Sequence, residues 1–527
     1  MRVKIVFGFL ISVFYVATAH ALLAISAKPS GPSEEQVSSW RAAVLESPGA
    51  LRALGNSEYR VLATEWIPRE NPKKLALQVY DYTRGRLLVF EAPLGELSSL
   101  SIRTSKDQPI PNRGEFEAAA KIAENDPELG SKIKSGELLP YSAMPLLLSR
   151  KEGVGGRRVL PLGLQPVKVG LAHEIIAVDL EKKSCRRFTE LAPSSALATA
   201  SACGPKSARQ GETEPGTAGS TEVDVKRAGE TLWTMKVTRA SASSGSFGSG
   251  VEIESIKYKG DLVLAKAHTP ILNVNYVNDK CGPFRDAVNY ENAFNADGRR
   301  VASGIVIADK QPTTIFDTRD DRGNFWGVAL YQDKDVFIVM SELSAGWYRY
   351  VNEYRFYPDG SIQPLFRFDA VHNSCTCEPH DHHVYWRLDF DLAGGKNSAH
   401  VLGSSGWNQV KQEKKHLRGP EFQSWRVLGP DGRSGYEITP GPHDEPSNAF
   451  GRGDAWILRE YAKEADESKL SDKVEAKLDY WVNGEDVRNQ DLVFWYGGHI
   501  RHGPGDHESP YVVGPMLKPV TLESSTR

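Results

Sequence analysis

The chain has 527 residues, of which 40% are hydrophobic and 11 are tryptophan, and its formal net charge at pH 7 is −3. This length exceeds what one hydrophobic core usually organises, so we expect two to four domains. The nearly balanced charge gives no reason to expect nucleic acid or an anionic membrane surface as a partner.

Residues 1–21 have the pattern of a secretory signal peptide. Arg2 and Lys4 precede an apolar run over 5–16, and Ala19-His-Ala21 supplies small residues for a cleavage site. About a dozen continuously apolar residues fall short of the ~20 that cross a bilayer. We therefore predict a secreted or periplasmic mature protein without a membrane span, and an uncleaved N-terminal anchor is the alternative.

A small α+β domain is predicted over 32–108. Ser33 and Gln36 have the spacing of a capping box ahead of a helix with Val37, Trp40 and Val44 on one face. Two apolar stretches that meet around Gly85 then predict a β-hairpin.

A second small α+β domain with the same order of elements is predicted over 109–194. Residues 115–129 predict a helix, and 173–180 with 185–190 predict another hairpin. The repeated order indicates a duplicated unit, and neither copy carries a cluster that we expect to be catalytic.

The rest of the chain is predicted to be mainly β. Residues 195–224 are rich in Ser, Ala, Gly, Thr and Pro and predict a linker. Over 225–527 helical periodicity is weak, which favours one large antiparallel β-sandwich. The stretches that predict its strands are 230–237, 251–260, 335–343, 348–368, 382–392, 477–484 and 491–498.

Five cysteines fit an exported protein with one or two disulfides, and the odd count leaves at least one thiol. Cys185 and Cys203 lie in the first half, and Cys281, Cys375 and Cys377 lie in the second. The sequence does not specify their pairing. Cys375-Thr-Cys377 is interpreted as structural, with metal binding as the alternative.

The stretch 380–391, HDHHVYWRLDFD, concentrates three of the 13 histidines. In a strand, alternate side chains share a face, so His380 and His382 should point to one buried side. His502 is the candidate third ligand from a distant strand. Three neutral imidazoles with an open position suit Cu(II) and catalytic Zn(II) almost equally. Hydrogen-bonded histidines without a metal are the alternative.

This stretch resembles the copper-dependent amine oxidases, whose HxH pair precedes an R-L-D-x-D strand. Asp389 and Asp391 follow His380 by nine and eleven residues, and His502 follows Asp491 of "DLVFW" by eleven, as in the family. The resemblance extends over nearly the whole mature chain, from "PSEEQVSSWRAAV" to the closing "MLKPV". It implies three copper ligands, which are His380, His382 and His502.

The resemblance also implies a second metal site for a calcium-like ion. Hard carboxylate and carbonyl oxygens suit Ca(II), and strand alternation places the aspartates on the face opposite the histidines. Solvated surface aspartates are the alternative. The implied ligands are the carboxylates of Asp389, Asp391 and Asp491 and the backbone carbonyls of Phe390 and Leu492.

A tyrosine-derived cofactor is implied as well. The family oxidises the tyrosine of an N-Y-D/E motif to topaquinone with copper and O2, and the strand match places this tyrosine at Tyr348. Tyr350 matches the aromatic residue two positions later, and Tyr276 matches the tyrosine that hydrogen-bonds a quinone oxygen. Trp347 stands where the family has Asn, and Arg349 stands where it has an acid.

The implied catalytic base is Asp286, in a stretch that partly matches a D-A-G-x-Y-like motif with Val288 in place of Gly. A carboxylate must remove the α-proton of the amine held by the quinone. The resemblance thus implies an exported, homodimeric oxidase that converts a small primary amine, O2 and water into an aldehyde, ammonia and hydrogen peroxide. A copper-binding relative without the quinone is the alternative, because Trp347 and Arg349 depart from the motif. A zinc hydrolase on the same histidines is a third possibility.

Overall fold

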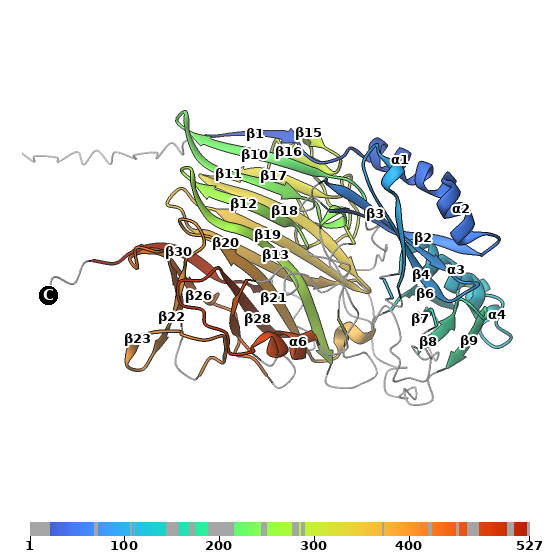
Figure 1. Ribbon diagram of the computed structural model, residues 1–527. Coiled ribbons are helices and arrows are strands. Elements are labelled where there is room, and N and C mark those ends of the chain that lie inside the picture. Colours follow the sequence, from blue (N-terminus) through green and yellow to red (C-terminus); the bar gives the residue numbers. More distant parts are fainter. Residues whose placement is uncertain are drawn as a thin grey trace, which may run out of the picture.

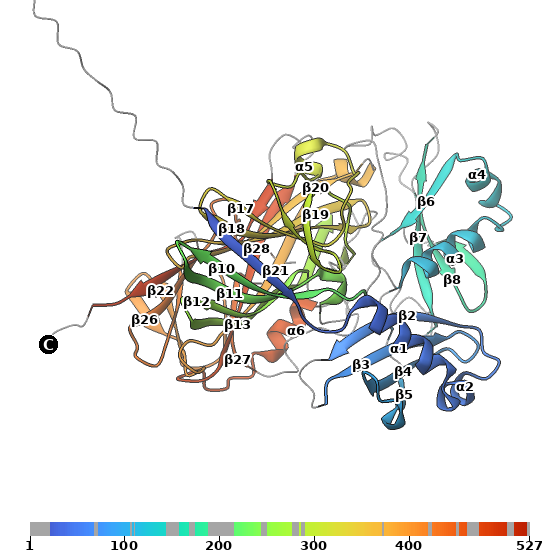
Figure 2. The same ribbon diagram turned by 90° about the horizontal axis from the view of Figure 1, so that it is seen from above.

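In a computed structural model of the protein, two small α+β domains lie beside a large β-sandwich (Figures 1 and 2), so the predicted fold class is confirmed. No helix in the described part of the chain combines the length and apolar character needed to cross a bilayer. The predicted signal peptide, 1–21, lies outside the described residues. The structure describes residues 22–67, 72–105, 108–109, 111–143, 157–167, 174–187, 216–243, 250–276, 284–285, 290–371, 374–419, 424–448, 453–460, 474–502 and 511–523.

The first small domain packs two helices on a four-stranded antiparallel sheet. Ser33 caps α1, since its hydroxyl accepts the Gln36 N–H (3.2 Å) and the Gln36 side chain accepts the Ser33 N–H (2.8 Å), which is the predicted capping box. Val37, Trp40 and Val44 are buried as predicted. The elements are α1 (Glu34–Glu46), α2 (Pro48–Leu54), β2 (Tyr59–Ile67), β3 (Lys74–Asp81), β4 (Arg86–Pro93) and β5 (Ser101–Ser105).

The second small domain repeats this layout. A buried ion pair between Glu115 and Arg158 (2.6 Å) joins the first turn of its long helix to the residue before β7. The elements are α3 (Arg113–Ala123), α4 (Gly130–Lys134), β6 (Leu138–Ser142), β7 (Val159–Pro166), β8 (Glu174–Asp179) and β9 (Ser184–Arg187).

The sandwich consists of two large sheets. The first has the order β1 (Leu23–Pro29), β10 (Ser220–Arg227), β11 (Glu230–Thr238), β12 (Glu252–Tyr258), β13 (Asp261–Tyr276), β21 (His380–Phe390), β28 (Leu492–His502), β27 (Ala455–Arg459) and β24 (Lys414–His416), with β14 (Phe284–Arg285) on β13. The second has the order β15 (Gly298–Ala302), β16 (Ile305–Ala308), β17 (Val328–Asp333), β18 (Val336–Ala345), β19 (Tyr348–Phe356), β20 (Ile362–Ala370), β30 (Met516–Thr521), β26 (Ser434–Thr439), β25 (Trp425–Leu428), β22 (Ser398–Gly403) and β23 (Gly406–Gln409), with β29 (Tyr511–Val513) on β20.

The first sheet begins before the small domains in the sequence and resumes after them. Strand β1 pairs with β10 along its whole length, from Leu23 opposite Arg227 to Pro29 opposite Thr221. The predicted linker, 195–224, therefore overlaps β10, which begins at Ser220. Residues 188–215 lie outside the described part of the chain.

The strand predicted over 477–484 is wrong, because residues Val474–Trp481 form helix α6. Leu478 and Trp481, three residues apart, both pack on the outer core of the first sheet, whereas Tyr480 is 81% exposed. In a strand Leu478 and Tyr480 would share a face, so this burial pattern requires helical spacing.

Strand β21 is buried on both of its faces. Its inward face contains the histidines and joins the core between the sheets, while Tyr385 on its outer face packs with Trp456, Trp495 and Leu478. Other positions predicted to face away from the core are buried too, including His383 beside His499 and Arg387.

Cysteine pairing is described in part. Cys375 is disulfide-bonded, whereas Cys185 is a half-buried free thiol. Cys203 and Cys281 lie outside the described residues.

Candidate metal centre and tyrosine site

The structure brings His380, His382 and His502 together. Strands β21 and β28 are antiparallel neighbours with His380 directly opposite His502, and His382 follows on the same face. One ring nitrogen from each residue lies within 4.8 Å of the others, and His380 Nε2 is 3.2 Å from His502 Nδ1. Among the described residues, no other group of three or more His, Cys, Asp or Glu side chains brings its ligand atoms within this distance.

The chemistry of this cluster fits a metal ion. Burial, together with the neighbouring His502, lowers the pKa of His380 to about 3, and burial holds the pKa of His382 well below its usual value, so both imidazoles are neutral. His380 Nδ1–H donates to the Glu378 carbonyl (2.5 Å), which leaves Nε2 as a lone-pair donor toward the cluster. Neither ring nitrogen of the buried His382 has a hydrogen-bond partner among the described residues. A bound Cu(II) or Zn(II) would remove the cost of burying it unpaired.

Tyr348 reaches the histidine cluster from the second sheet. It is fully buried, and its hydroxyl is hydrogen-bonded to His380 Nε2 and lies 3.4 Å from His502 Nδ1. Its ring centroid is 4.6 Å from that of His382 in an edge-on arrangement, and the Tyr350 ring stacks beside it at 5.7 Å. The predicted cofactor tyrosine thus contacts the predicted copper ligands.

A tight hairpin positions Tyr348. Ala345 pairs with Tyr348, so Gly346 and Trp347 form a two-residue connection between β18 and β19. Gly346 has φ +57°, as the first central residue of a type II′ turn requires.

Trp347 and Tyr276 lie beside the cluster. Tyr276, at the end of β13, stacks on His380 with ring centroids 4.6 Å apart, and its hydroxyl accepts the indole N–H of Trp347 (2.8 Å). The Trp347 ring also contacts Tyr141 of β6 (5.6 Å). Trp347 therefore ties the tyrosine hairpin both to a neighbour of the cluster and to the second small domain.

Arg349 lies on the opposite face of β19 and is fully buried. Its guanidinium forms a two-pronged ion pair with Asp321 (2.7 and 2.8 Å) and donates to the carbonyls of Gly346 (3.1 Å) and Tyr348 (2.8 Å). The positive charge is therefore balanced away from the histidines, and the same side chain fixes the backbone of the hairpin. Sequence reasoning missed Asp321, because no motif connects it to Arg349.

A hydrogen-bonded carboxyl completes this buried group. Asn292 donates to Asp321 (2.7 Å) and to Glu342 (2.7 Å). Burial raises the pKa of Glu342 to about 8, so this carboxyl is mainly protonated at neutral pH. Asp321, and not the protonated Glu342, therefore forms the ion pair with Arg349.

Replacing Arg349 with Met is expected to destabilise the protein by about 3–5 kcal/mol, because it leaves the buried charge of Asp321 without its Arg349 partner. The double variant Arg349→Met/Asp321→Asn should recover part of this loss. Urea unfolding measures both. Arg355→Met is the matched control on the same strand, where the partly exposed pair with Glu353 should contribute about 1 kcal/mol or less. Equal losses at Arg349 and Arg355 would contradict the expectation.

The three aspartates predicted to bind calcium lie near one another. Asp391 and Asp491 flank Gly395, where an added Cβ would lie 3.2 Å from Asp391 Oδ1 and 3.6 Å from Asp491 Oδ1. Burial and the charges of Asp389, Glu460 and Asp391 raise the pKa of Asp491 to about 6. Asp389 accepts a hydrogen bond from Arg387 (3.0 Å), and Asp391 Oδ1 is buried without a partner among the described residues. Phe390 and Leu492 lie opposite each other in register.

These carboxylates are spaced more widely than the histidines and do not form an equally tight group. Asp286, the predicted base, lies outside the described residues.

The fold and the site thus define the class of protein: it is a mainly β sandwich with a buried cluster of three histidines. Solved structures share this fold. The copper-containing benzylamine oxidase from Hansenula polymorpha has a TM-score of 0.63 at 11% identity, covering 93% of this chain and 97% of that chain. An amine oxidase from Aspergillus nidulans has a TM-score of 0.56 at 13% identity, covering 94% of this chain and 89% of that chain. Lysyl oxidase from Pichia pastoris has a TM-score of 0.56 at 12% identity, covering 95% of this chain and 92% of that chain.

No protein-family profile matches the sequence, and no curated protein matches it. At 11–13% identity the likeness is one of fold. The chain has the fold of the copper-containing amine oxidases, and its histidine cluster lies within that fold.

Proposed function

We propose that the protein is an exported copper- and topaquinone-dependent oxidase that deaminates a small primary amine to an aldehyde and releases ammonia and hydrogen peroxide. One observation carries the proposal. The Tyr348 hydroxyl is hydrogen-bonded to His380 and lies 3.4 Å from His502 Nδ1 inside a buried histidine cluster. A buried tyrosine in contact with three clustered imidazoles, of which those of His380 and His382 are neutral, is positioned for metal-dependent oxidation of its ring. The fold shared with a copper-containing benzylamine oxidase supports the proposal.

Each side chain of the site then has a role. His380, His382 and His502 would hold copper, which with O2 would supply the oxidation of Tyr348 to topaquinone, the group that takes up the amine. Tyr276 would hold the His380 ring in its orientation by stacking on it. Tyr350 would support the Tyr348 ring by stacking beside it, with its own ring edge-on to that of His382. Asp286 would accept the α-proton of the bound amine.

A copper-binding relative that does not form the quinone is the second candidate, and Trp347 favours it. The indole is larger than the Asn of the family motif and is hydrogen-bonded to the Tyr276 hydroxyl next to the cluster. It leaves less room beside Tyr348 for O2 and an amine. Arg349 does not favour this candidate, because Asp321 balances its charge on the other face of the strand.

Aerobic loading of the purified apoprotein with Cu(II) separates the two candidates. For an oxidase we expect a visible quinone absorption band to develop, followed by peroxide release when benzylamine is added. Loading with Zn(II) is the control and should give neither signal. Bound copper without the band would exclude the oxidase and leave the non-catalytic relative.

We also propose that Asp389, Asp391 and Asp491, with the carbonyls of Phe390 and Leu492, bind calcium. Three neighbouring carboxylates without a cation repel one another, so the ion would stabilise the fold more than it affects the chemistry. Chelating calcium from the purified protein should therefore lower its melting temperature. In the variant Asp391→Asn, chelation should lower the melting temperature by less than in the wild type. A melting temperature unchanged by chelation in the wild type would rule out this site.

Export and a homodimeric assembly complete the proposal. The signal pattern over 1–21 motivates export, and the family resemblance motivates the dimer. N-terminal sequencing of the secreted protein should find Leu22 as the first residue. Light scattering should give twice the mass of one chain.

A further inference from the structure

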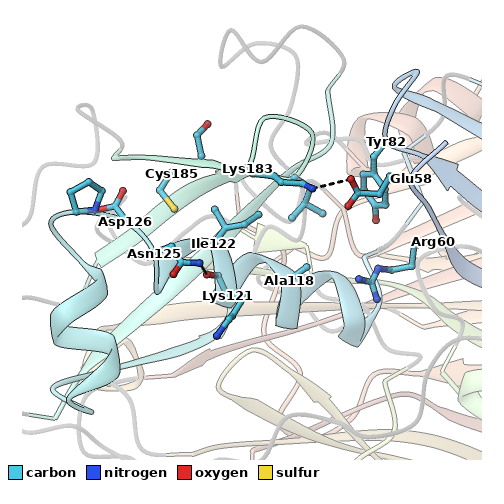
Figure 3. A pocket seen from close by; sticks show the side chains of 13 residues that line it. Glu58, Arg60, Tyr82, Ala118, Lys121, Ile122, Asn125, Asp126, Lys183 and Cys185 are labelled. Atoms are coloured by element: carbon cyan, nitrogen blue, oxygen red, sulfur yellow. Dashed lines mark hydrogen bonds and ion pairs between the residues drawn. The ribbon is translucent and has the colours of Figure 1, made fainter. Parts of the chain in front are cut away.

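A cavity of about 520 Å³ lies between the two small domains, apart from the histidine cluster (Figure 3). The first domain contributes Glu58 just before β2, Arg60 in β2 and Tyr82 just after β3. The second contributes residues of α3, of the loop that follows it and of the β8–β9 hairpin. This volume is within the range of small-molecule sites, which are often found where domains meet.

Most charges around the cavity are already compensated. Lys183 Nζ of the second domain pairs with Glu58 of the first at 2.9 Å, and Lys121 Nζ pairs with Glu124 at 3.0 Å. Asp126 Oδ1 accepts the backbone N–H groups of residues 128 and 129. Arg60, in contrast, makes no hydrogen bond or ion pair with any residue that the structure describes. The hydrogen-bond donors of the Arg60 guanidinium are therefore not used by the described residues, while Asp126 keeps a negative charge beside Cys185 in another part of the wall.

The guanidinium of Arg60 lies close to α3. A Cβ at Gly114 would overlap Arg60 Nη1, so the glycine makes room for this side chain. The rest of the wall includes an apolar surface formed by Ala118, Ile122 and Leu180. Burial raises the pKa of the Cys185 thiol to about 11, so this side chain adds a neutral surface and not a second charge.

We propose that this cavity binds a small monocarboxylate with an apolar body. The carboxylate would pair with the Arg60 fork, since guanidinium and carboxylate form short, charge-assisted hydrogen bonds in matching geometry. The apolar body would lie on Ala118, Ile122 and Leu180. A dianion such as phosphate fits less well, because the neighbouring lysines are already paired and the apolar surface would gain nothing. A ligand here would contact both small domains, and its binding is separate from the chemistry proposed for the histidine cluster.

Calorimetric titration of the full-length protein with benzoate tests the proposal. We expect saturable binding of benzoate by the wild type and at least about tenfold weaker binding by Arg60→Met, because the variant loses the charge-assisted pair. Arg103→Met is the matched control, since Arg103 is an exposed arginine of the same domain that pairs with Glu91 away from the cavity. Its affinity should equal that of the wild type. Melting curves establish that both variants are folded.

Two further measurements locate the ligand and define its chemistry. Benzoate should slow the alkylation of Cys185 by iodoacetamide in the wild type and in Arg103→Met, but not in Arg60→Met. Peptide mass spectrometry measures the rate of alkylation. Benzamide and inorganic phosphate should bind at least about tenfold more weakly than benzoate. Absence of benzoate binding, equal binding by Arg60→Met, or phosphate binding as tight as benzoate would each overturn the proposal.

Discussion

Replacing His382 with Ala is expected to lower the Cu(II) affinity at least about a hundredfold, since losing a direct ligand should cost more than the 10–100-fold typical of outer partners. His382 is the most informative of the three histidines, because its ring nitrogens have no other partner among the described residues. The apoprotein should remain folded, since the variant removes buried nitrogens that no hydrogen bond satisfies. Competition titration with a copper chelator measures the affinity, and electron paramagnetic resonance reports the number of nitrogen ligands.

His383→Gln is the matched control, one residue along the same strand. His383 lies on the other face of β21, where its Nδ1 is 2.8 Å from Nδ1 of His499. We expect copper affinity and the resonance spectrum to stay close to those of the wild type, even if the variant melts at a lower temperature. If His383→Gln loses copper while His382→Ala retains it, the assignment of ligands is wrong.

Tyr348→Phe is expected to abolish amine-dependent peroxide release while copper binding is retained. The α-proton of an amine is too weakly acidic for an unaided carboxylate, so the chemistry requires the electron-withdrawing group that Tyr348 would become. Asp286→Asn should instead permit quinone formation and slow turnover by about 10²–10⁴-fold, the usual contribution of a general base. Mass spectrometry of the peptide with Tyr348, from copper-loaded protein, and a peroxide assay with benzylamine measure these effects.

Tyr350→Phe is the control for Tyr348, because the two rings stack at 5.7 Å and lie on the same face of β19. It should still form the quinone and release peroxide. An unmodified Tyr348 in copper-loaded wild type, together with no peroxide, would favour the non-catalytic relative and assign the loss to the region around Trp347.

The alternation in 380–391 was sufficient to predict which histidines share a face, because a strand has a strict period of two. It could not predict that the other face is also buried. Part of that burial comes from α6, a distant segment whose eight residues contain too few turns to establish a helical period. Packing against Trp456 and Trp495 decides its conformation.

The partners of Trp347 and Arg349 lay beyond sequence reasoning for a similar reason. A charged residue inside a strand predicts a polar face, but its counter-ion can come from anywhere in the chain. Asp321 is 28 residues before Arg349, and Tyr276 is 71 residues before Trp347. Only the sandwich, which brings β13 and β19 to the histidine cluster, makes these pairs close. The two residues that looked like defects of a motif therefore have specific partners.

The pairing of β1 with β10 imposes an order on how the chain reaches its native state. Leu23–Pro29 is synthesised first among the described strands, yet β10, the strand beside it in the described part of the sheet, is made about 190 residues later. The two small domains have local contacts and separate cores, so each can fold while β1 still waits for a partner. Until β10 emerges, β1 is an unpaired edge able to associate with other chains. Charged side chains in β1 and β10, such as Lys28, then protect the chain before folding is complete, because charge on an unpaired strand discourages its association with other chains.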